Sequence, residues 1–341
     1  MLLLENIIIV ASVILFISLY FFCMRSERWQ RARIRFKRDR LGSLCFLIIC
    51  LYALIGLMDS IQLSSQTTLL DYCFRKVPQE KSYSAPFAHT TYSVNNPEPL
   101  KGRHWVGTDF FGKDVLLQSM KACRTAVIIG GLTSLIYIPL GVLFGIAAGY
   151  YKRWIDDLIQ YIYSTLASIP GILLLIATIM VLDNLNIKIW GDEPLRIPRL
   201  VQISLALGVT SWVGLCRLIR GETLRQVERP YAEAAKVLGQ RNIQIMFHHI
   251  LPNIMHLVII NFILGFSGLV LTESILSYIG IGAPIGTASW GLMINSARME
   301  LAREPTVWWN ITAATIALFL LVLSLNLLGD SLRRAFNPRA R

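Results

Sequence analysis

Long apolar runs separated by polar segments constrain this chain more than any other feature. Only 16% of its 341 residues are charged and 54% are hydrophobic, whereas about 25% of the residues of a typical soluble domain are charged. Several runs approach or exceed the ~20 residues that a helix needs to cross a bilayer. We therefore expect an all-α polytopic membrane protein with seven spans, at residues 3–24, 42–58, 126–149, 158–182, 201–218, 256–280 and 307–328.

The placement of Lys and Arg predicts an orientation, because these residues gather on the cytoplasmic side of a membrane protein. Segments 25–41, 150–157, 217–255 and 329–341 together hold 20 of the 33 basic residues. If they are cytoplasmic, the N-terminus lies outside and the C-terminus inside. Topology then accounts for the net charge of +12, and nucleic-acid binding is disfavoured because aromatic and basic residues interleave only around Trp29–Phe36.

The first apolar run is followed, not preceded, by basic residues, which is the reverse of a secretory signal. We read it as an uncleaved span. The basic linker after it either serves only as a topology signal, which is the preferred reading, or lies along the lipid surface. Segment 59–125 contains four prolines and little apolar periodicity, so we expect an irregular external loop without a core of its own. The predicted parts are an N-terminal helix (1–24), a basic linker (25–41), a span (42–58), the external loop (59–125), a helical core (126–335) and a tail (336–341).

Pro230–Asn253 is the longest mainly polar insert in the hydrophobic second half. Pro230 suits the first position of a helix, and Gly239 suits a left-handed residue just after its end. The pattern predicts a helix over Tyr231–Leu238 with a smooth alanine surface, and a second short helix over Asn242–Ile250 that ends at Leu251-Pro252. We expect this helix–turn–helix to dock into a groove on another protein.

Residues 107–116 (GTDFFGKDVL) copy most of a phosphate-binding P-loop. Asp114, however, stands where Ser or Thr should hold magnesium, and no apolar strand precedes the segment. We therefore reject nucleotide binding at this site.

The spacing of Glu233-Ala234-Ala235, Gly239 and His249–Pro252 resembles the EAA loop of permease subunits of binding-protein-dependent ABC importers. Residues 107–116 resemble the GTD-x-x-G-[RK]-D-V-L signature of the peptide and nickel permeases, in the branch named after the C subunit. Further stretches resemble that branch in the same order, at residues 212–221, 276–282, 288–291, 326–333 and 337–339.

The resemblance implies a six-span permease core, here with one extra N-terminal span, in a bacterial inner membrane. It implies that a loop at 230–253 couples to ATPase subunits through Tyr231, Glu233, Ala234, Ala235, Gly239, Leu251 and Pro252. It also implies a periplasmic motif made of Gly107, Thr108, Asp109, Gly112 and Asp114.

The implied partners are a second homologous permease, two ABC ATPase subunits, a periplasmic solute-binding protein and membrane lipid. The chain itself would be no enzyme and would bind no cofactor or metal, because ATP and Mg²⁺ would bind to the ATPase subunits. The implied cargo is a peptide or similar solute, with a nickel chelate or a peptide antibiotic as alternatives. A non-transporting membrane scaffold or receptor, or an exporter half, are readings of another class.

Glycines and two isolated residues suggest how the spans pack. Gly141, Gly145 and Gly149 share one helix face, so we expect another backbone to approach it closely, with a pore-lining face as the alternative. Pro170, in a Ser-Ile-Pro-Gly segment, and Glu273, inside a span, are candidates for the translocation path. For Pro170 an ordinary kink is the alternative, and for Glu273 a structural hydrogen bond.

Three further residue sets carry weaker expectations. The five histidines show no metal-ligand spacing, and we place His248 and His249 at a turn near the lipid headgroups. Arg217 and Arg220 are read as side chains that snorkel at a helix end. A disulfide between Cys73 and Cys123, both on the predicted outer side, is left open as a hypothesis.

Overall fold

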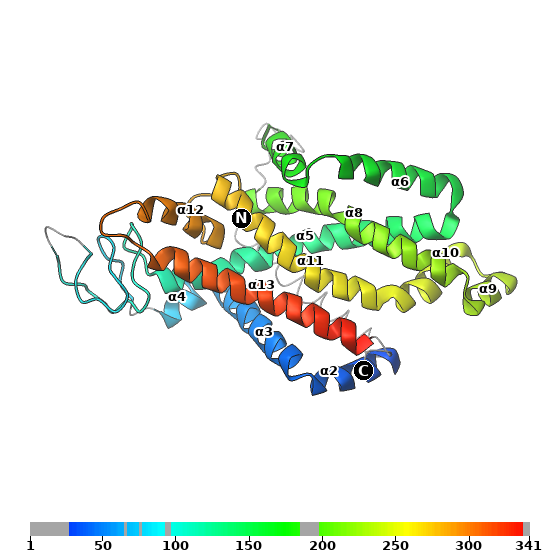
Figure 1. Ribbon diagram of the computed structural model, residues 1–341, viewed down its shortest axis with the longest axis horizontal. Coiled ribbons are helices and arrows are strands. Elements are labelled where there is room, and N and C mark those ends of the chain that lie inside the picture. Colours follow the sequence, from blue (N-terminus) through cyan, green and yellow to red (C-terminus); the bar gives the residue numbers. More distant parts are fainter. Residues whose placement is uncertain (1–26, 65–66, 75–76, 93–96, 185–197, 337–341) are drawn as a thin grey trace. The chain divides into compact units, whose positions relative to one another are not determined.

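The structure is a computed structural model, which describes residues 27–64, 67–74, 77–92, 97–184 and 198–336 (Figure 1). The described part is mainly helical. Its helices are α2 (Glu27–Arg38), α3 (Arg40–Ser60), α4 (Leu69–Cys73), α5 (Val115–Tyr151), α6 (Arg153–Ser168), α7 (Gly171–Asn184), α8 (Arg199–Val227), α9 (Pro230–Val237), α10 (Asn242–Gln244), the π-helix η1 (Ile245–Ile250), α11 (Leu251–Ile279), α12 (Trp290–Glu300) and α13 (Trp309–Phe336). Strands β1 (Gln62–Ser64) and β2 (Thr67–Thr68) form an antiparallel pair.

Five described helices are long and apolar enough to cross a membrane, namely α3, α5, α8, α13 and the continuous helix from Asn242 to Ile279. The pair α6 and α7 would make a sixth span if it counts as one. The predicted spans from 42–58 onward fall on these helices, whereas the predicted span 3–24 lies outside the described residues. The expectation of a polytopic all-α protein is therefore confirmed.

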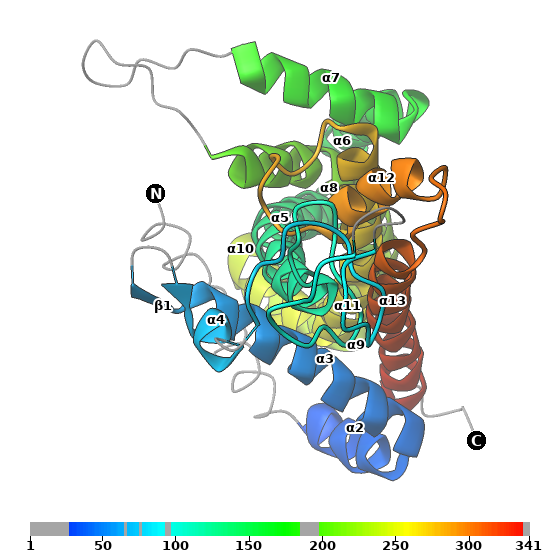
Figure 2. The same ribbon diagram turned by 90° about the vertical axis from the view of Figure 1, so that its left-hand side faces the viewer.

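The predicted span at 158–182 is not one straight helix. Helices α6 and α7 meet at Ile169-Pro170 with a bend of 95°. When the view is turned by 90°, α7 is seen from the side and α6 nearly end-on (Figures 1 and 2). Proline disfavours helical backbone in the residue before it, and Ile169 is extended, with φ −91° and ψ 133°. By contrast, α5 is not interrupted at Pro139.

The chain divides into two compact units. The first comprises residues 1–130 and 267–331, and the second comprises residues 131–266 and 332–341. In the first unit, α3 is tied to α13 by two hydrogen bonds: the Tyr52 hydroxyl donates to the Ala317 carbonyl (2.9 Å), and the Ser331 hydroxyl donates to Asp39 (2.7 Å).

The loop at 59–125 is irregular as predicted, apart from α4 and the short β pair, but it is well packed. Leu70, Ser84, His104 and Thr108 are buried. The loop shares its core with α13, since the buried Trp309 donates from its indole N–H to the Thr108 carbonyl (3.0 Å). The loop itself is poor in apolar residues, so Trp309, at the start of α13, supplies part of its core.

In the second unit the expected glycine contact is present. A Cβ atom on Gly141, Gly145 or Gly149 would lie 3.0, 2.8 or 2.7 Å from a side chain of α8. Such close approach lets two helices pack in lipid, where burial of apolar surface gives no advantage. The expectation that this face of α5 lies against a neighbour is confirmed.

Candidate functional site

Helix α9 forms as its sequence predicts. Pro230 occupies the first turn, and the helix ends at Val237. Gly239 then adopts a left-handed φ of +74°. Its N–H donates to the Lys236 carbonyl (3.0 Å), and the Gln240 N–H donates to the Ala235 carbonyl (3.1 Å). These two bonds form a Schellman motif, which satisfies carbonyls that a helix end leaves unpaired.

The three alanines of α9 do not form one exposed surface as expected. Ala232 and Ala235 are buried, three residues apart on one face, whereas Ala234 is exposed together with Glu233. The small side chains on the inner face allow α9 to lie against the unit, where it contacts α8 and η1. The alanine pair therefore seats the helix, and its outer face remains open.

The second helix of the loop is not short, which corrects the prediction. Helix α10 continues through η1 directly into α11, so that the helix runs on past Leu251 and Pro252. A proline inside an α-helix lacks an N–H and crowds the preceding turn. Here the preceding turn is a π-helix, whose wider spacing accommodates such a residue. His248 and His249 lie in this π-helix, not at a turn.

Side-chain bonds tie the loop to the ends of the long helices. The Tyr150 hydroxyl at the end of α5 donates to the Asn242 side chain (2.8 Å), and the Tyr231 hydroxyl donates to Gln226 at the end of α8 (2.7 Å). The ammonium of Lys236 lies 5.2 Å from the centre of the Tyr150 ring, within the range of a cation–π contact. A displacement of α9 would therefore act on both α5 and α8.

The tip of the loop is apolar and open. Val237 is 87% exposed, Leu238 79% and Ile243 63%. Glu233, Gln240 and Arg241 are also exposed beside them. Apolar side chains surrounded by polar ones on a protruding element are typical of a protein interaction site.

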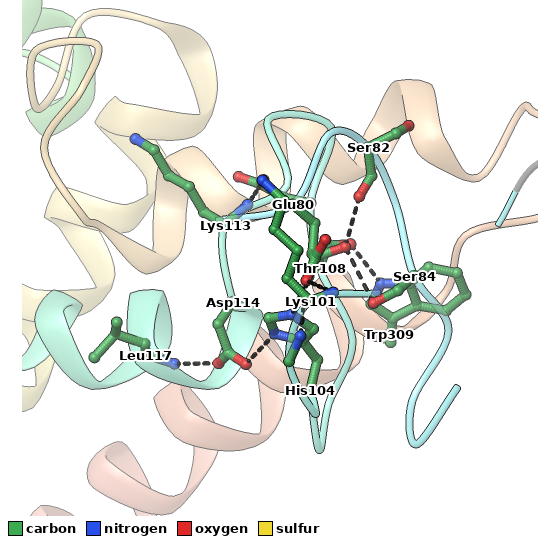
Figure 3. A network of polar contacts seen from close by, with 12 residues as sticks. Glu80, Ser82, Ser84, Lys101, His104, Thr108, Lys113, Asp114, Leu117 and Trp309 are labelled. Carbon is green, nitrogen blue, oxygen red and sulfur yellow. Dashed lines mark hydrogen bonds and ion pairs between the residues drawn. The ribbon is translucent and has the colours of Figure 1, made fainter. Parts of the chain in front are cut away.

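The motif at 107–114 has a different character, shown in Figure 3. Thr108 is buried, and its hydroxyl donates to the Ser82 carbonyl (2.8 Å). One carboxylate oxygen of Asp109 accepts the Lys113 N–H (2.8 Å), and the other accepts the side-chain amide of Gln118 (2.6 Å). The motif thus connects the loop to the first turns of α5.

Two glycines of this motif are required by the packing. Gly107 and Gly112 have φ angles of +84° and +70°. A Cβ on Gly107 would lie 2.4 Å from the Ser84 carbonyl oxygen, and one on Gly112 would lie 1.9 Å from that of Glu80. Both positions exclude any side chain.

Asp114 and His104 join two segments of the loop (Figure 3). One carboxylate oxygen of Asp114 accepts the Leu117 N–H (2.9 Å) and caps α5. The other lies 2.9 Å from Nδ1 of the buried His104, whose Nε2 lies 3.4 Å from Glu80. Glu80 also accepts the Lys101 N–H (2.7 Å). These groups satisfy one another, which indicates a structural role.

The same geometry argues against a phosphate site. In a P-loop the backbone N–H groups point at the phosphates. Here the N–H groups of Thr108, Asp109, Gly112 and Lys113 already donate to oxygens of the chain. A phosphate would also meet the carboxylates of Asp109 and Asp114.

Glu273 is buried at the end of α11 (1% exposed) and accepts hydrogen bonds from the hydroxyls of Ser277 (2.6 Å) and Ser289 (2.8 Å). Ser289 caps α12, since its hydroxyl accepts the Gly291 N–H (3.1 Å). Glu273 therefore holds the turn between α11 and α12. Pro170, in the second unit, is exposed at the bend between α6 and α7.

Two weaker expectations are wrong. Arg220 does not snorkel: it forms a bidentate ion pair with Asp156 of α6, with N–O distances of 2.6 and 2.7 Å, while the Arg217 guanidinium lies 4.8 Å from the centre of the Tyr163 ring. Asp156 precedes one predicted span and Arg220 follows the next, so both lie on the same predicted side of the membrane. Their opposite charges could have signalled this pair. Cys73 and Cys123 are both free thiols, the first exposed and the second buried.

Comparison with known proteins identifies the family. Residues 141–341 match the family model of the binding-protein-dependent transport system inner membrane component. The chain belongs to this family. The permease is 28% identical to the dipeptide transport system permease protein of Alkalihalophilus pseudofirmus over 92% of this chain and 90% of that protein. It is 26% identical to the oligopeptide transport system permease protein of Bacillus subtilis, over the same shares of the two chains.

A third relative is the glutathione transport system permease protein of Pectobacterium atrosepticum, 31% identical over 70% of the permease and 73% of that protein. All three relatives are transport system permease proteins. Together with the long apolar helices, they make the permease a multi-pass membrane protein. The family match spans the whole of the 230–253 loop and begins after the 107–114 motif.

Proposed function

We propose that this permease is one half of the translocation path of an ABC importer for peptides or similar small solutes in a bacterial inner membrane. The names of its relatives support this cargo, since each transports a dipeptide, an oligopeptide or glutathione. In this proposal the chain pairs with a second permease, two ATPase subunits and a periplasmic solute-binding protein. ATP and Mg²⁺ bind to the ATPases.

The observation that carries the proposal is the construction of the 230–253 loop. Its tip is apolar and exposed, its inner face is seated by two alanines, and its second half is the start of α11 itself. A partner that pushed on this tip would act on α5 and α8 through Tyr150 and Tyr231. Such a joined element can bias helices between two packings, as alternating access requires.

The proposal includes a topology and a domain organisation. It has seven spans, with the N-terminus outside and the C-terminus cytoplasmic, and the coupling loop at 230–253 lies within the core at 126–335. The excess of Lys and Arg in the segments assigned to the cytoplasm supports this orientation. Cysteines introduced at position 64 and in the 230–253 loop should label from opposite sides of the membrane.

The proposed coupling can be tested with a double variant at the tip, Val237→Asp with Leu238→Asp. Both side chains are exposed, so we expect normal abundance in the membrane, loss of co-purification with the ATPase subunits and loss of peptide uptake. A matched control is Met299→Asp, the same kind of change at an exposed residue of α12. Retention of the ATPases by the double variant would contradict coupling at this loop.

A negative uptake result alone would not separate a transporter from a scaffold. The wild-type complex should therefore also be reconstituted in vesicles with its binding protein, ATPases and a radiolabelled dipeptide. ATP-dependent accumulation supports an importer. ATPase binding without accumulation of any peptide tested would favour the scaffold reading.

A further inference from the structure

Helix α6 has three different faces. The first, formed by Asp156, Ile159 and Tyr163, is buried. It lies against α8, where Asp156 pairs with Arg220 and the Tyr163 ring lies beneath Arg217. Figure 1 shows α6 running alongside α8, and α8 is itself long and apolar enough to be a membrane span. Helix α6 therefore lies alongside a candidate span, with its first turn at the end that the placement of Lys and Arg assigns to the cytoplasm (segments 150–157 and 217–255).

The second face is polar and exposed. It consists of Asp157, Tyr161, Ser164 and Ser168, which we call the α6 polar stripe. Their spacing of four, three and four residues places them on one side of a helix with 3.6 residues per turn. Tyr161 is 72% exposed. The described part of the chain covers none of these four residues.

The third face is mainly apolar and also exposed. Its polar member, the exposed Thr165, donates from its hydroxyl to the Tyr161 carbonyl (2.8 Å). Trp154, Leu158 and Ile162 follow one another at intervals of four residues, next to the polar stripe on the helix surface. An apolar exposed face on a membrane protein suits contact with lipid. Helix α6 thus has one face that packs against its own chain and one face that suits lipid. The remaining, polar face suits neither of these surroundings.

Polar groups in contact with hydrocarbon are costly, and those at membrane depth usually face protein or a water-filled cavity. The polar stripe runs for three turns and ends two residues before Pro170, at the bend into α7. A regular stripe of this length, parallel to an apolar one, matches a helix placed between lipid and water. The Ser168 hydroxyl donates to the Thr165 carbonyl (2.7 Å), so it adds no unpaired donor to the face.

We propose that the α6 polar stripe lines the water-filled path through which the solute passes, which rests on the importer function proposed above. The stripe offers three hydroxyls and one carboxylate, and the exposed Arg153 lies one turn before Asp157 on the same side of the helix. Asp157 is exposed, in contrast to Asp156, whose charge is paired with Arg220. The oxygen atoms of the stripe suit solutes rich in N–H donors, such as the amides of a peptide.

The test is cysteine labelling in the complete transporter, with the six native cysteines replaced. Ser164→Cys and Ser168→Cys report on the stripe, and Leu158→Cys and Ile162→Cys are matched controls on the exposed apolar face of the same helix. A membrane-impermeant maleimide should label the stripe at least about tenfold faster, because the reactive thiolate forms where water reaches the sulfur. Labelling after denaturation confirms that each thiol is present.

A second measurement tests whether the carboxylate of Asp157 sets the local charge next to Tyr161. A cationic methanethiosulfonate should modify Tyr161→Cys faster than an anionic one of similar size, because Asp157 lies one turn away. Adding Asp157→Asn should remove that difference. A purely structural role for Asp157 would leave the ratio of the two rates unchanged.

Equal labelling of the stripe and the apolar face would overturn the proposal, because it would place both in the same medium. Stripe cysteines that resist labelling but form disulfides with the second permease would also overturn it, since the stripe would then be a protein interface. The labelling pattern does not depend on uptake. A transporter that labels as expected but accumulates no peptide would therefore contradict the proposed function and leave the aqueous face of α6 standing.

Discussion

The 230–253 loop and the 107–114 motif both carry family signatures, yet they use their residues in opposite ways. In the motif, the contacts of Thr108 and Asp114 and the close packing at Gly107 and Gly112 all lie within the chain. In the loop, only the inner alanines are buried, and the tip is left open. A sequence signature therefore identifies residues that matter, but the structure distinguishes those that hold the fold from those available to a partner.

The largest expected difference, in the yield of folded protein, is between variants of two glycines with similar backbone angles. Gly112 and Gly239 have φ of +70° and +74°, but a Cβ would lie 1.9 Å from a carbonyl oxygen at Gly112 and would meet nothing within 4 Å at Gly239. Gly112→Ala should abolish accumulation of folded protein in the membrane. Gly239→Ala should cost only about 1–2 kcal/mol for its left-handed backbone.

The amount of monodisperse protein extracted in mild detergent measures both glycine variants. Similar yields for the two would break the comparison, because they would show that the packing around Gly112 can relax. A low yield for Gly239→Ala alone would reverse it.

A smaller difference, in the thermal midpoint, is expected between variants of two acidic residues. Asp114→Ala removes the cap of α5, worth about 0.5–2 kcal/mol, and leaves buried His104 without one of its partners. Glu233→Ala changes an exposed residue of α9 and should leave the thermal midpoint of the purified complex unchanged. Asp114→Asn, which still caps the helix, should lie between the wild type and Asp114→Ala. An equal midpoint for all variants would show that the motif network does not support the fold.

The smallest effect concerns pH. Burial raises the pKa of Glu300, and this outweighs the hydrogen bonds from Asn310 and Tyr83 that lower it. A carboxyl with a raised pKa in the folded state stabilises the fold below its unfolded pKa, near 4.3, and that contribution is lost as pH rises through the folded value. Glu300→Gln should therefore flatten the fall in thermal midpoint above that pH.

Titration of the thermal midpoint for wild type and Glu300→Gln measures this effect. Glu304→Gln is the matched control at an exposed neighbour. Parallel curves for wild type and Glu300→Gln would show that this carboxyl titrates alike in the folded and unfolded protein.

Local patterns in the sequence predicted much of the fold. The positions of the long helices, the cap of α9 at Gly239 and the glycine face of α5 all follow from apolar length, turn chemistry or side-chain size. Features that depend on contacts between distant segments were missed. The ion pair of Asp156 with Arg220 joins residues 64 positions apart, and the buried partners of His104 become clear only once the loop is folded.

The continuation of α10 into α11 was missed for another reason. Pro252 indicates a helix end by local rules, but the π-helix before it removes the conflict, and no pattern in the sequence announced that turn. The candidate site was thus predictable in position. Its inner and outer faces, and its continuous connection to a long helix, required the structure.

The glycine face of α5 has a mechanical consequence. Because Gly141, Gly145 and Gly149 have no side chains, α5 lies directly against Leu215, Ile219 and Thr223 of α8, and no side chain of α5 separates the two helices at these three positions. Within that unit we expect the two helices to move as one body. A force delivered at the loop would then tilt α5 and α8 together, and a methyl group added at any of the three glycines would force the two helices apart.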